Sequence, residues 1–178
     1  MSREIPSVAI TRPTPAYDIL TWVQAHIVEE PKRIRMGVWC LFRADVPTGF
    51  EDEYDSVYNF PRCGTVACEA GWIALRSGIE LVNHLPVIEG RGVSWEDMAE
   101  VIAGFSETAR TELRHSFLGG AHFDTPDGTR EQAEATAKFL EDFKRNWRRE
   151  LKARIILPGG MVQSACSRVL QKTLGDKR

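Results

Sequence analysis

The segment Cys63-Gly64-Thr65-Val66-Ala67-Cys68-Glu69-Ala70-Gly71-Trp72 departs most from average composition, and the predicted fold is built around it. Two of the four cysteines and one of the five tryptophans fall within these ten residues. Thr65 is a suitable N-cap, because its hydroxyl accepts a hydrogen bond from a free backbone N–H of the first helical turn. Gly78 can adopt the left-handed conformation and is expected to end the helix. The almost wholly apolar residues between them predict a buried central helix over about 65–77.

Gly71 lies in the interior of this predicted helix. A glycine there costs about 1 kcal/mol relative to alanine. We therefore expect another backbone to approach closely at Gly71, with the Trp72 ring filling the adjacent space.

The two cysteines of the segment are candidate nucleophiles. Helix N-termini lower the pKa of a nearby thiol, and Cys63 and Cys68 flank the predicted helix start. In this interpretation His122 is the general base and Asp124 orients it, as in papain-like thiol chemistry. The glutamine that such an enzyme needs upstream is absent, since 59–62 reads Asn-Phe-Pro-Arg. The alternative is that Cys68 is a small buried apolar residue and Cys63 a turn residue.

The run CGTVACEAGW, preceded by Met36-Gly37-Val38-Trp39, resembles a group of uncharacterised proteins from bacteriophages and bacteria. Those proteins carry a methionine–tryptophan segment, a CGT-x-x-C-x-x-G-W/H motif and a helical remainder. The resemblance covers about Arg35 to Gly78. It implies a phage or mobile-element origin and transfers no activity.

The composition is that of an ordinary globular protein, with 43% apolar and 27% charged residues in a chain of 178. Prolines mark 1–14 as an extended arm, and 15–178 is expected to form a single helical domain. No apolar run approaches the ~18 residues that span a bilayer, which favours a cytosolic protein. Together with the resemblance to phage proteins, this implies the cytoplasm of a bacterial host. The four cysteines contain no C-x-x-C pair, so we expect no metal and no cofactor.

Hydrophobic periodicity and capping residues predict further helices, which makes the fold class mainly α, with five or six helices around 65–77. The segment 34–42 is compatible with a strand or a helix, and 34–42 with 79–88 is a candidate β-hairpin. The other expected helices are 17–30, 94–105 after Ser94, 106–117 after Ser106, 130–155 after Thr129, and 161–174.

Charge is unevenly distributed along the chain. By count of basic and acidic side chains, 1–50 carries +1, 51–107 carries −8 and 108–178 carries +5. An acidic middle argues against indiscriminate nucleic-acid binding, which needs an overall basic domain. The long loop 44–61 contains many of these acidic side chains, and it is interpreted as a solvated surface loop, a lid or a divalent-cation site. Its acidic centre comprises Glu51, Asp52, Glu53 and Asp55.

A basic stripe occurs at i, i+3, i+4 and i+7 of the helix expected at 130–155. Its residues are Arg145, Arg148, Arg149 and Lys152. The arginine fork suits phosphate and carboxylate groups, although the same charges also fit a solvated helix C-terminus.

The stripe favours a non-enzymatic binding protein, in which it captures or inhibits a host protein or binds a phosphate-bearing small molecule. The alternatives are a cysteine-dependent hydrolase or acyltransferase, and a purely structural or regulatory subunit. A homodimer that joins the acidic middle to the basic end also remains open. Membranes and nucleic acids are not expected partners.

Overall fold

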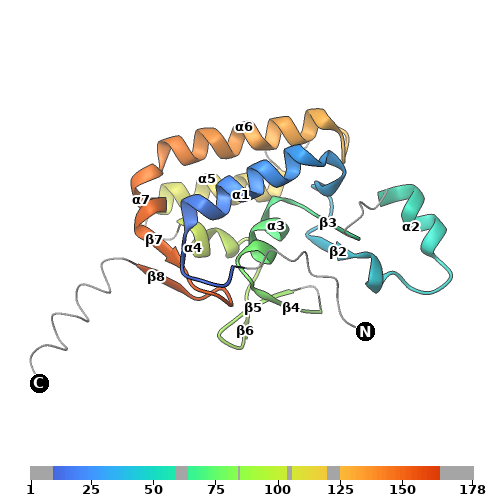
Figure 1. Ribbon diagram of the computed structural model, residues 1–178, viewed down its shortest axis with the longest axis horizontal. Coiled ribbons are helices and arrows are strands. Elements are labelled where there is room, and N and C mark those ends of the chain that lie inside the picture. Colours follow the sequence, from blue (N-terminus) through green and yellow to red (C-terminus); the bar gives the residue numbers. More distant parts are fainter. Residues whose placement is uncertain (1–9, 59–63, 84, 104–105, 120–124, 165–178) are drawn as a thin grey trace, which may run out of the picture.

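The computed structural model describes residues 10–58, 64–83, 85–103, 106–119 and 125–164 (Figure 1). Within these residues the chain forms seven α-helices and three small antiparallel sheets. The helices are α1 (Ala16–Glu29), α2 (Glu51–Tyr58), α3 (Glu69–Arg76), α4 (Met98–Ala103), α5 (Glu107–Gly119), α6 (Arg130–Asn146) and α7 (Arg148–Ala153). The strands are β1 (Thr14–Pro15), β2 (Cys40–Phe42), β3 (Thr65–Ala67), β4 (Glu80–Val82), β5 (Leu85–Ile88), β6 (Arg91–Gly92), β7 (Arg154–Ile156) and β8 (Val162–Ser164).

The prediction of a mainly α fold is wrong. The described residues are 55% helical and 16% strand, which makes the fold mixed α/β. Much of the difference lies in 65–67, 154–155 and 162–164, which are predicted to be helical and form strands. Each of them contains β-branched residues. The strands β3 and β7 pair with β2 and β1, which are far away in the sequence and are not revealed by the local pattern, whereas β8 pairs with the nearby β7.

The central segment combines a strand with a helix. Thr65 is not an N-cap, because β3 pairs with β2 and aligns Leu41 with Val66. The backbone around β3 is bonded to the chain before β2: Arg35 N donates to Ala67 O at 3.0 Å, and Cys68 N donates to Val38 O at 2.7 Å. With these groups engaged, the helix begins only at Glu69.

The predicted central position and close backbone contact of this helix are confirmed. All residues from Glu69 to Leu75 are buried. A Cβ at Gly71 would lie 1.8 Å from Trp39 O, so the β2 side of the molecule packs directly on the α3 backbone. Trp72 is fully buried and its Nε1 donates to Arg33 O at 2.8 Å. Gly78 has φ 70°, the left-handed conformation predicted for the stop.

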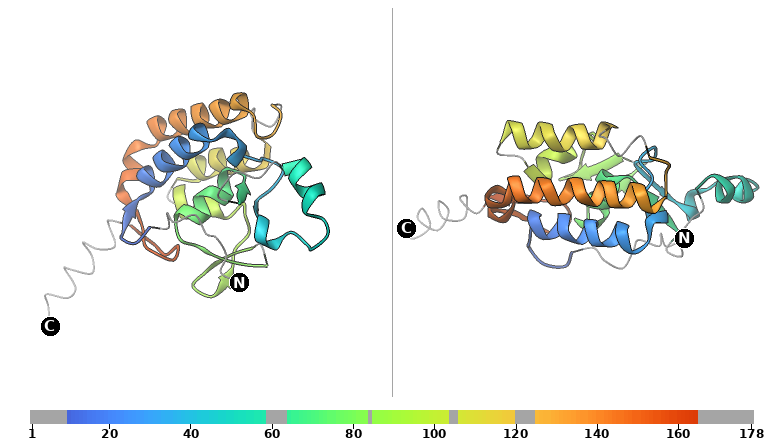
Figure 2. Two further views of the ribbon diagram at one scale, coloured as in Figure 1. Left: turned by 45° about the vertical axis from the view of Figure 1, so that its right-hand side comes forward. Right: turned by 90° about the horizontal axis from the view of Figure 1, so that it is seen from above.

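Helices α1 and α6 lie side by side along one face of the molecule (Figures 1 and 2). The helix expected at 17–30 is confirmed as α1, whose buried residues are Ala16, Ile19, Leu20, Val23, His26 and Ile27. Helix α1 also packs on α3, while α4 packs on α5. The core therefore lies between the α1–α6 pair and the α3–α5 layer.

The single helix expected over 130–155 is broken at Trp147, whose φ of −109° and ψ of 19° end α6. Trp147 is half-buried and its Nε1 donates to Glu112 Oε2 on α5 at 2.7 Å. Helix α7 follows for six residues and leads into β7, which lies between β1 and β8. The helix expected at 161–174 is also wrong where it is described, since 162–164 is β8; residues 165–178 lie outside the described part.

The remaining sheet is β4–β5–β6, so 79–88 pairs within its own neighbourhood and the hairpin with 34–42 is wrong. The other three predicted caps form bonds from backbone N–H groups to side-chain oxygens, although the Ser94 cap belongs to the turn that leads into α4, which begins at Met98 and not near 94. The bonds are Asp97 N to Ser94 Oγ at 3.1 Å, Ala109 N to Ser106 Oγ at 3.2 Å and Gln132 N to Thr129 Oγ1 at 3.2 Å.

Candidate functional site

The Cys68 thiol is fully buried, as the packing interpretation of this residue requires. Its Sγ donates to Trp39 O at 3.6 Å. Burial raises the pKa of the thiol to about 12, which outweighs the lowering effect of backbone N–H groups at the start of α3. Since the thiolate is the nucleophile, a thiol that stays protonated at neutral pH is not activated. Cys63, His122 and Asp124 lie outside the described residues.

A buried carboxyl group lies next to this thiol, and sequence reasoning missed it. Glu69 is fully buried at the first position of α3, and Ser116 Oγ on α5 donates to its Oε2 at 2.6 Å. Burial raises the pKa of Glu69 to about 8, so the carboxyl group is largely protonated at neutral pH. The only sequence signal was a lone acidic residue at the start of an otherwise apolar helix.

His26 is a packing residue on the buried face of α1. Its ring stacks on Trp22 at 4.2 Å between centroids and meets the edge of Trp72 at 4.5 Å. Burial, and then the nearby Arg33 guanidinium, lower the pKa of His26 to about 4. The imidazole ring is therefore neutral at pH 7 and packs against the two tryptophans as an aromatic side chain.

A polar network fixes the start of α6. Asp127 Oδ1 accepts from Met36 N at 2.9 Å and from Gln132 Nε2 at 2.7 Å. Gly128 N donates to Gln132 Oε1 at 2.9 Å. These bonds connect the loop before α6 to the segment before β2. We therefore assign Asp127 and Gln132 a structural role.

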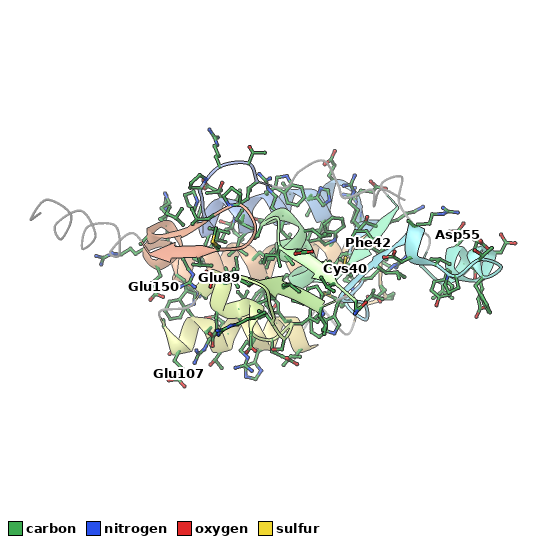
Figure 3. All side chains as sticks on the ribbon, turned by 90° about the horizontal axis from the view of Figure 1, so that it is seen from below. Cys40, Phe42, Asp55, Glu89, Glu107 and Glu150 are labelled. Carbon is green, nitrogen blue, oxygen red and sulfur yellow. The ribbon has the colours of Figure 1, made fainter. Side chains whose placement is uncertain are left out.

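The four predicted basic residues, here called the basic end, lie around the α6–α7 junction. Trp147 and Leu151 anchor the inner side of α7, and Leu151 is fully buried. This places the basic end at one end of the molecule's long axis, where Figure 3 labels Glu150 (Figures 1 and 3). Arg145, Arg148, Arg149 and Lys152 are all exposed.

These four residues differ in how they are engaged. Arg145 pairs with Asp142 at 2.7 Å, and Lys152 Nζ lies 5.2 Å from the Tyr17 ring centroid. Arg148 and Arg149 have no hydrogen-bonding or ionic partner within the part of the chain that the structure describes. The guanidinium groups of two consecutive residues on an anchored helix are therefore available to anions.

Arg154 follows the basic end in sequence but does not belong to it. Its side chain is buried and Nε donates to Val101 O at 2.8 Å, with Nη2 bonded to Glu100 O. Burial lowers the pKa of Arg154 to about 10. The residue holds β7 against the carbonyls of α4.

The segment expected to be an acidic loop contains helices. We call 43–58 the acidic arm: it comprises the 3-10 turn η2 (Arg43–Asp45), a bend and α2. Asp55 pairs with Arg43, which joins α2 to the 3-10 turn at the start of the arm. No group of three or more His, Cys, Asp or Glu that could hold a metal ion occurs among the described residues. Figure 3 labels Asp55 at the end of the molecule opposite Glu150.

An open hollow of about 460 Å³ runs along α5. Its lining residues are Glu107, Thr108, Thr111, Glu112 and His115. The carboxylate of Glu112 is engaged by Trp147, so the hollow adjoins the anchor of the basic end. Its acidic lining does not extend the cationic surface.

Comparison of the chain with protein-family models, curated proteins and solved structures finds no match. In the ranges that the structure describes, every helix is too short or too polar to cross a membrane.

Proposed function

We propose that this chain is a non-enzymatic interaction protein whose basic end binds an acidic protein surface or a phosphate-bearing small molecule. The observation that supports this most is that Arg148 and Arg149, consecutive residues of α7, are both exposed with no acidic partner among the described residues. Guanidinium groups bind phosphate and carboxylate in a bidentate manner, which gives a directed contact rather than a diffuse attraction.

The anchoring of α7 makes this surface suitable for binding. Trp147 and Leu151 fix the backbone beneath the arginines, so binding orders side chains only and does not have to order a loop. Each exposed ion pair contributes only about 0.2–1 kcal/mol, so binding requires several of the four cations together. This favours a ligand with several negative charges.

The state of Cys68 supports the non-enzymatic proposal over thiol chemistry at that residue, because its thiol is buried and protonated. The resemblance of the 35–78 segment to phage proteins adds the proposal that the partner belongs to a bacterial host. In that case the protein is an accessory factor that captures or inhibits a host component.

Reversing the two free charges tests the proposal. Tripolyphosphate and a poly-glutamate peptide are titrated calorimetrically into the wild type and into Arg148→Glu/Arg149→Glu. We expect binding of at least one probe to weaken at least about tenfold in the variant, equivalent to about 1.4 kcal/mol.

The matched control is Arg130→Glu/Lys138→Glu, which changes net charge equally at two exposed positions of α6 away from the basic end. This control should bind the probes as the wild type does within about twofold, because screened charges contribute little at a distance. Equal losses in both variants, or no binding of either probe to the wild type, would refute the assignment of the surface.

A further inference from the structure

The ring of Tyr17, in the first turn of α1, is contacted by two lysine side chains that come from the two sides of the break between α6 and α7. Lys144 Nζ on α6 lies 5.4 Å from the ring centroid, and Lys152 Nζ on α7 lies 5.2 Å from it. Cations at this distance are attracted to the face of an aromatic ring. Because both lysines reach the same ring, the end of α6 and α7 present a common side to the start of α1, beside which they lie in Figures 1 and 2.

Arg148 belongs to this same side of the junction. It lies four positions after Lys144 and four positions before Lys152, and residues four apart are neighbours on a helix surface. The helical geometry is kept through the break, because the backbone N–H groups of 147 and 151 donate to the carbonyl oxygens four residues earlier, each at 3.0 Å. Lys144, Arg148 and Lys152 therefore form one row along the flank that faces α1.

Arg145 and Arg149 lie on a different side of the basic end. One step along a helix rotates a side chain by about 100°, so Arg149 is turned away from Arg148. Arg145 precedes Arg149 by four positions and is paired with Asp142 at 2.7 Å. The basic end thus has two sides, and the side with Arg148 and Lys152 is the one that adjoins Tyr17.

Two of the three cations in the row lack an acidic partner. Lys144 is 3% exposed, pairs with Glu141 at 2.9 Å and donates to Thr21 Oγ1 on α1 at 3.3 Å. Arg148 and Lys152 are exposed and have no ionic partner within the ranges that the structure describes. The row therefore carries an excess of positive charge next to α1, which a bound anion would neutralise.

The Tyr17 hydroxyl adds a neutral donor to these cations. The side chain is half-buried, and its hydroxyl group forms no hydrogen bond to any residue in the described part of the chain. A phenol donates one O–H, an ammonium group has three N–H donors and a guanidinium group has five. Tyr17, Arg148 and Lys152 together bring three kinds of donor from two helices to one junction.

We propose that Tyr17, Arg148 and Lys152 form a subsite for a single phosphate group, either a phosphate monoester or the end of a polyphosphate. A terminal phosphate group carries up to two negative charges and three acceptor oxygens, which match the two unpaired cations and the hydroxyl donor. A carboxylate carries one charge and two oxygens, so an acidic peptide fits the subsite less well. This inference rests on the proposed function of the basic end and selects the phosphate-bearing class of ligand for it.

Substitutions that remove one donor at a time test the subsite by calorimetric titration with tripolyphosphate. Arg148→Gln and Lys152→Gln should each weaken binding at least about fivefold, because each removes a charge-assisted hydrogen bond to the phosphate group. Tyr17→Phe removes only the hydroxyl group and keeps the ring that the lysines contact. It should weaken binding at least about threefold, through the loss of one hydrogen bond to a charged ligand.

The matched control is Arg149→Gln, which removes the same charge from the next residue, on the other side of the basic end. It should bind tripolyphosphate within about twofold of the wild type, because an exposed charge without a direct contact contributes little. A loss in Arg149→Gln equal to that in Arg148→Gln would overturn the subsite. Wild-type affinity in Tyr17→Phe, with its fold verified by circular dichroism, would also overturn it.

The choice of probe separates this inference from the proposed function. Binding of tripolyphosphate that depends on Tyr17 and Arg148 supports both. Binding of poly-glutamate without binding of tripolyphosphate overturns the phosphate subsite and leaves the proposed function in place. If the wild type binds neither probe, both are refuted.

Discussion

Replacing Gly71 with alanine is expected to lower the free energy of unfolding by about 3 kcal/mol or more, at or above the upper end of what overpacking usually costs. The new Cβ would lie 1.8 Å from Trp39 O and 2.8 Å from the Ala67 Cβ. One neighbour is a backbone carbonyl, and the other is the Cβ of a buried residue within the β2–β3 pair. Relief therefore requires a shift between α3 and the segment before β2.

Equilibrium denaturation in urea measures this effect. The matched control is Gly92→Ala, because a Cβ at Gly92 meets no atom within 4 Å and its φ is not left-handed. Its unfolding midpoint should change by the small amount typical of surface substitutions, within about 0.5 kcal/mol. Equal midpoints for Gly71→Ala and the wild type would show that α3 does not pack on Trp39 as described.

The second large effect is a dependence of stability on pH that Glu69→Gln removes. The pKa of Glu69 is about 8 in the folded protein and near its ordinary value of 4.5 once unfolded. Between these values the folded state holds a proton that the unfolded state has released. Stability is therefore highest below pH 4.5 and is lost as pH rises to about 8, at about 1.4 kcal/mol per pH unit.

Glutamine keeps an acceptor for Ser116 Oγ and has no proton to lose, so its variant should lack this slope. The readout is the difference between wild type and variant at each pH. His26 contributes an opposite slope, because its pKa of about 4 removes stability as pH falls from 6.5, and this cancels in the difference. Glu131→Gln on the exposed face of α6 serves as control. A constant difference from pH 5 to about 8 would contradict a protonated Glu69.

Much of the helical framework was predictable from local pattern. Helix α1, the three caps at Ser94, Ser106 and Thr129, and the burial of 69–75 followed from side-chain periodicity and capping chemistry. Gly71 was informative because a glycine inside an apolar helix needs a tertiary reason. These features depend on residues within a few positions of each other, which is the range that sequence patterns report.

The strands were not predictable in the same way. Thr65 has a hydroxyl that fits an N-cap, yet it lies in β3 and pairs with Phe42 of β2. Phe42 is too far away in the sequence for a local pattern to reveal this pairing. Likewise, apolar residues continue at helical spacing through Trp147 in the sequence of 130–155, so the pattern does not indicate a break. At the break, Trp147 donates a hydrogen bond to Glu112 on α5, which is a tertiary contact. Tertiary pairing overrode the helical pattern at both places.

In the candidate site, too, features that depend on local spacing were predictable and features that depend on tertiary contacts were not. Exposure of Arg148 and Arg149 followed from their place opposite the apolar stripe, and this prediction depended only on helical spacing. The Glu69–Ser116 pair joins residues 47 positions apart, so no sequence pattern could indicate it.

Mapping of backbone amide chemical shifts by NMR during addition of tripolyphosphate tests most directly whether the basic end is the binding surface. We expect the largest saturable shifts at 145–152, with the amides of 64–72 unchanged. Shifts that centre on 64–72 and leave α7 unaffected would contradict the proposed function, because they would place the ligand at the cysteine segment.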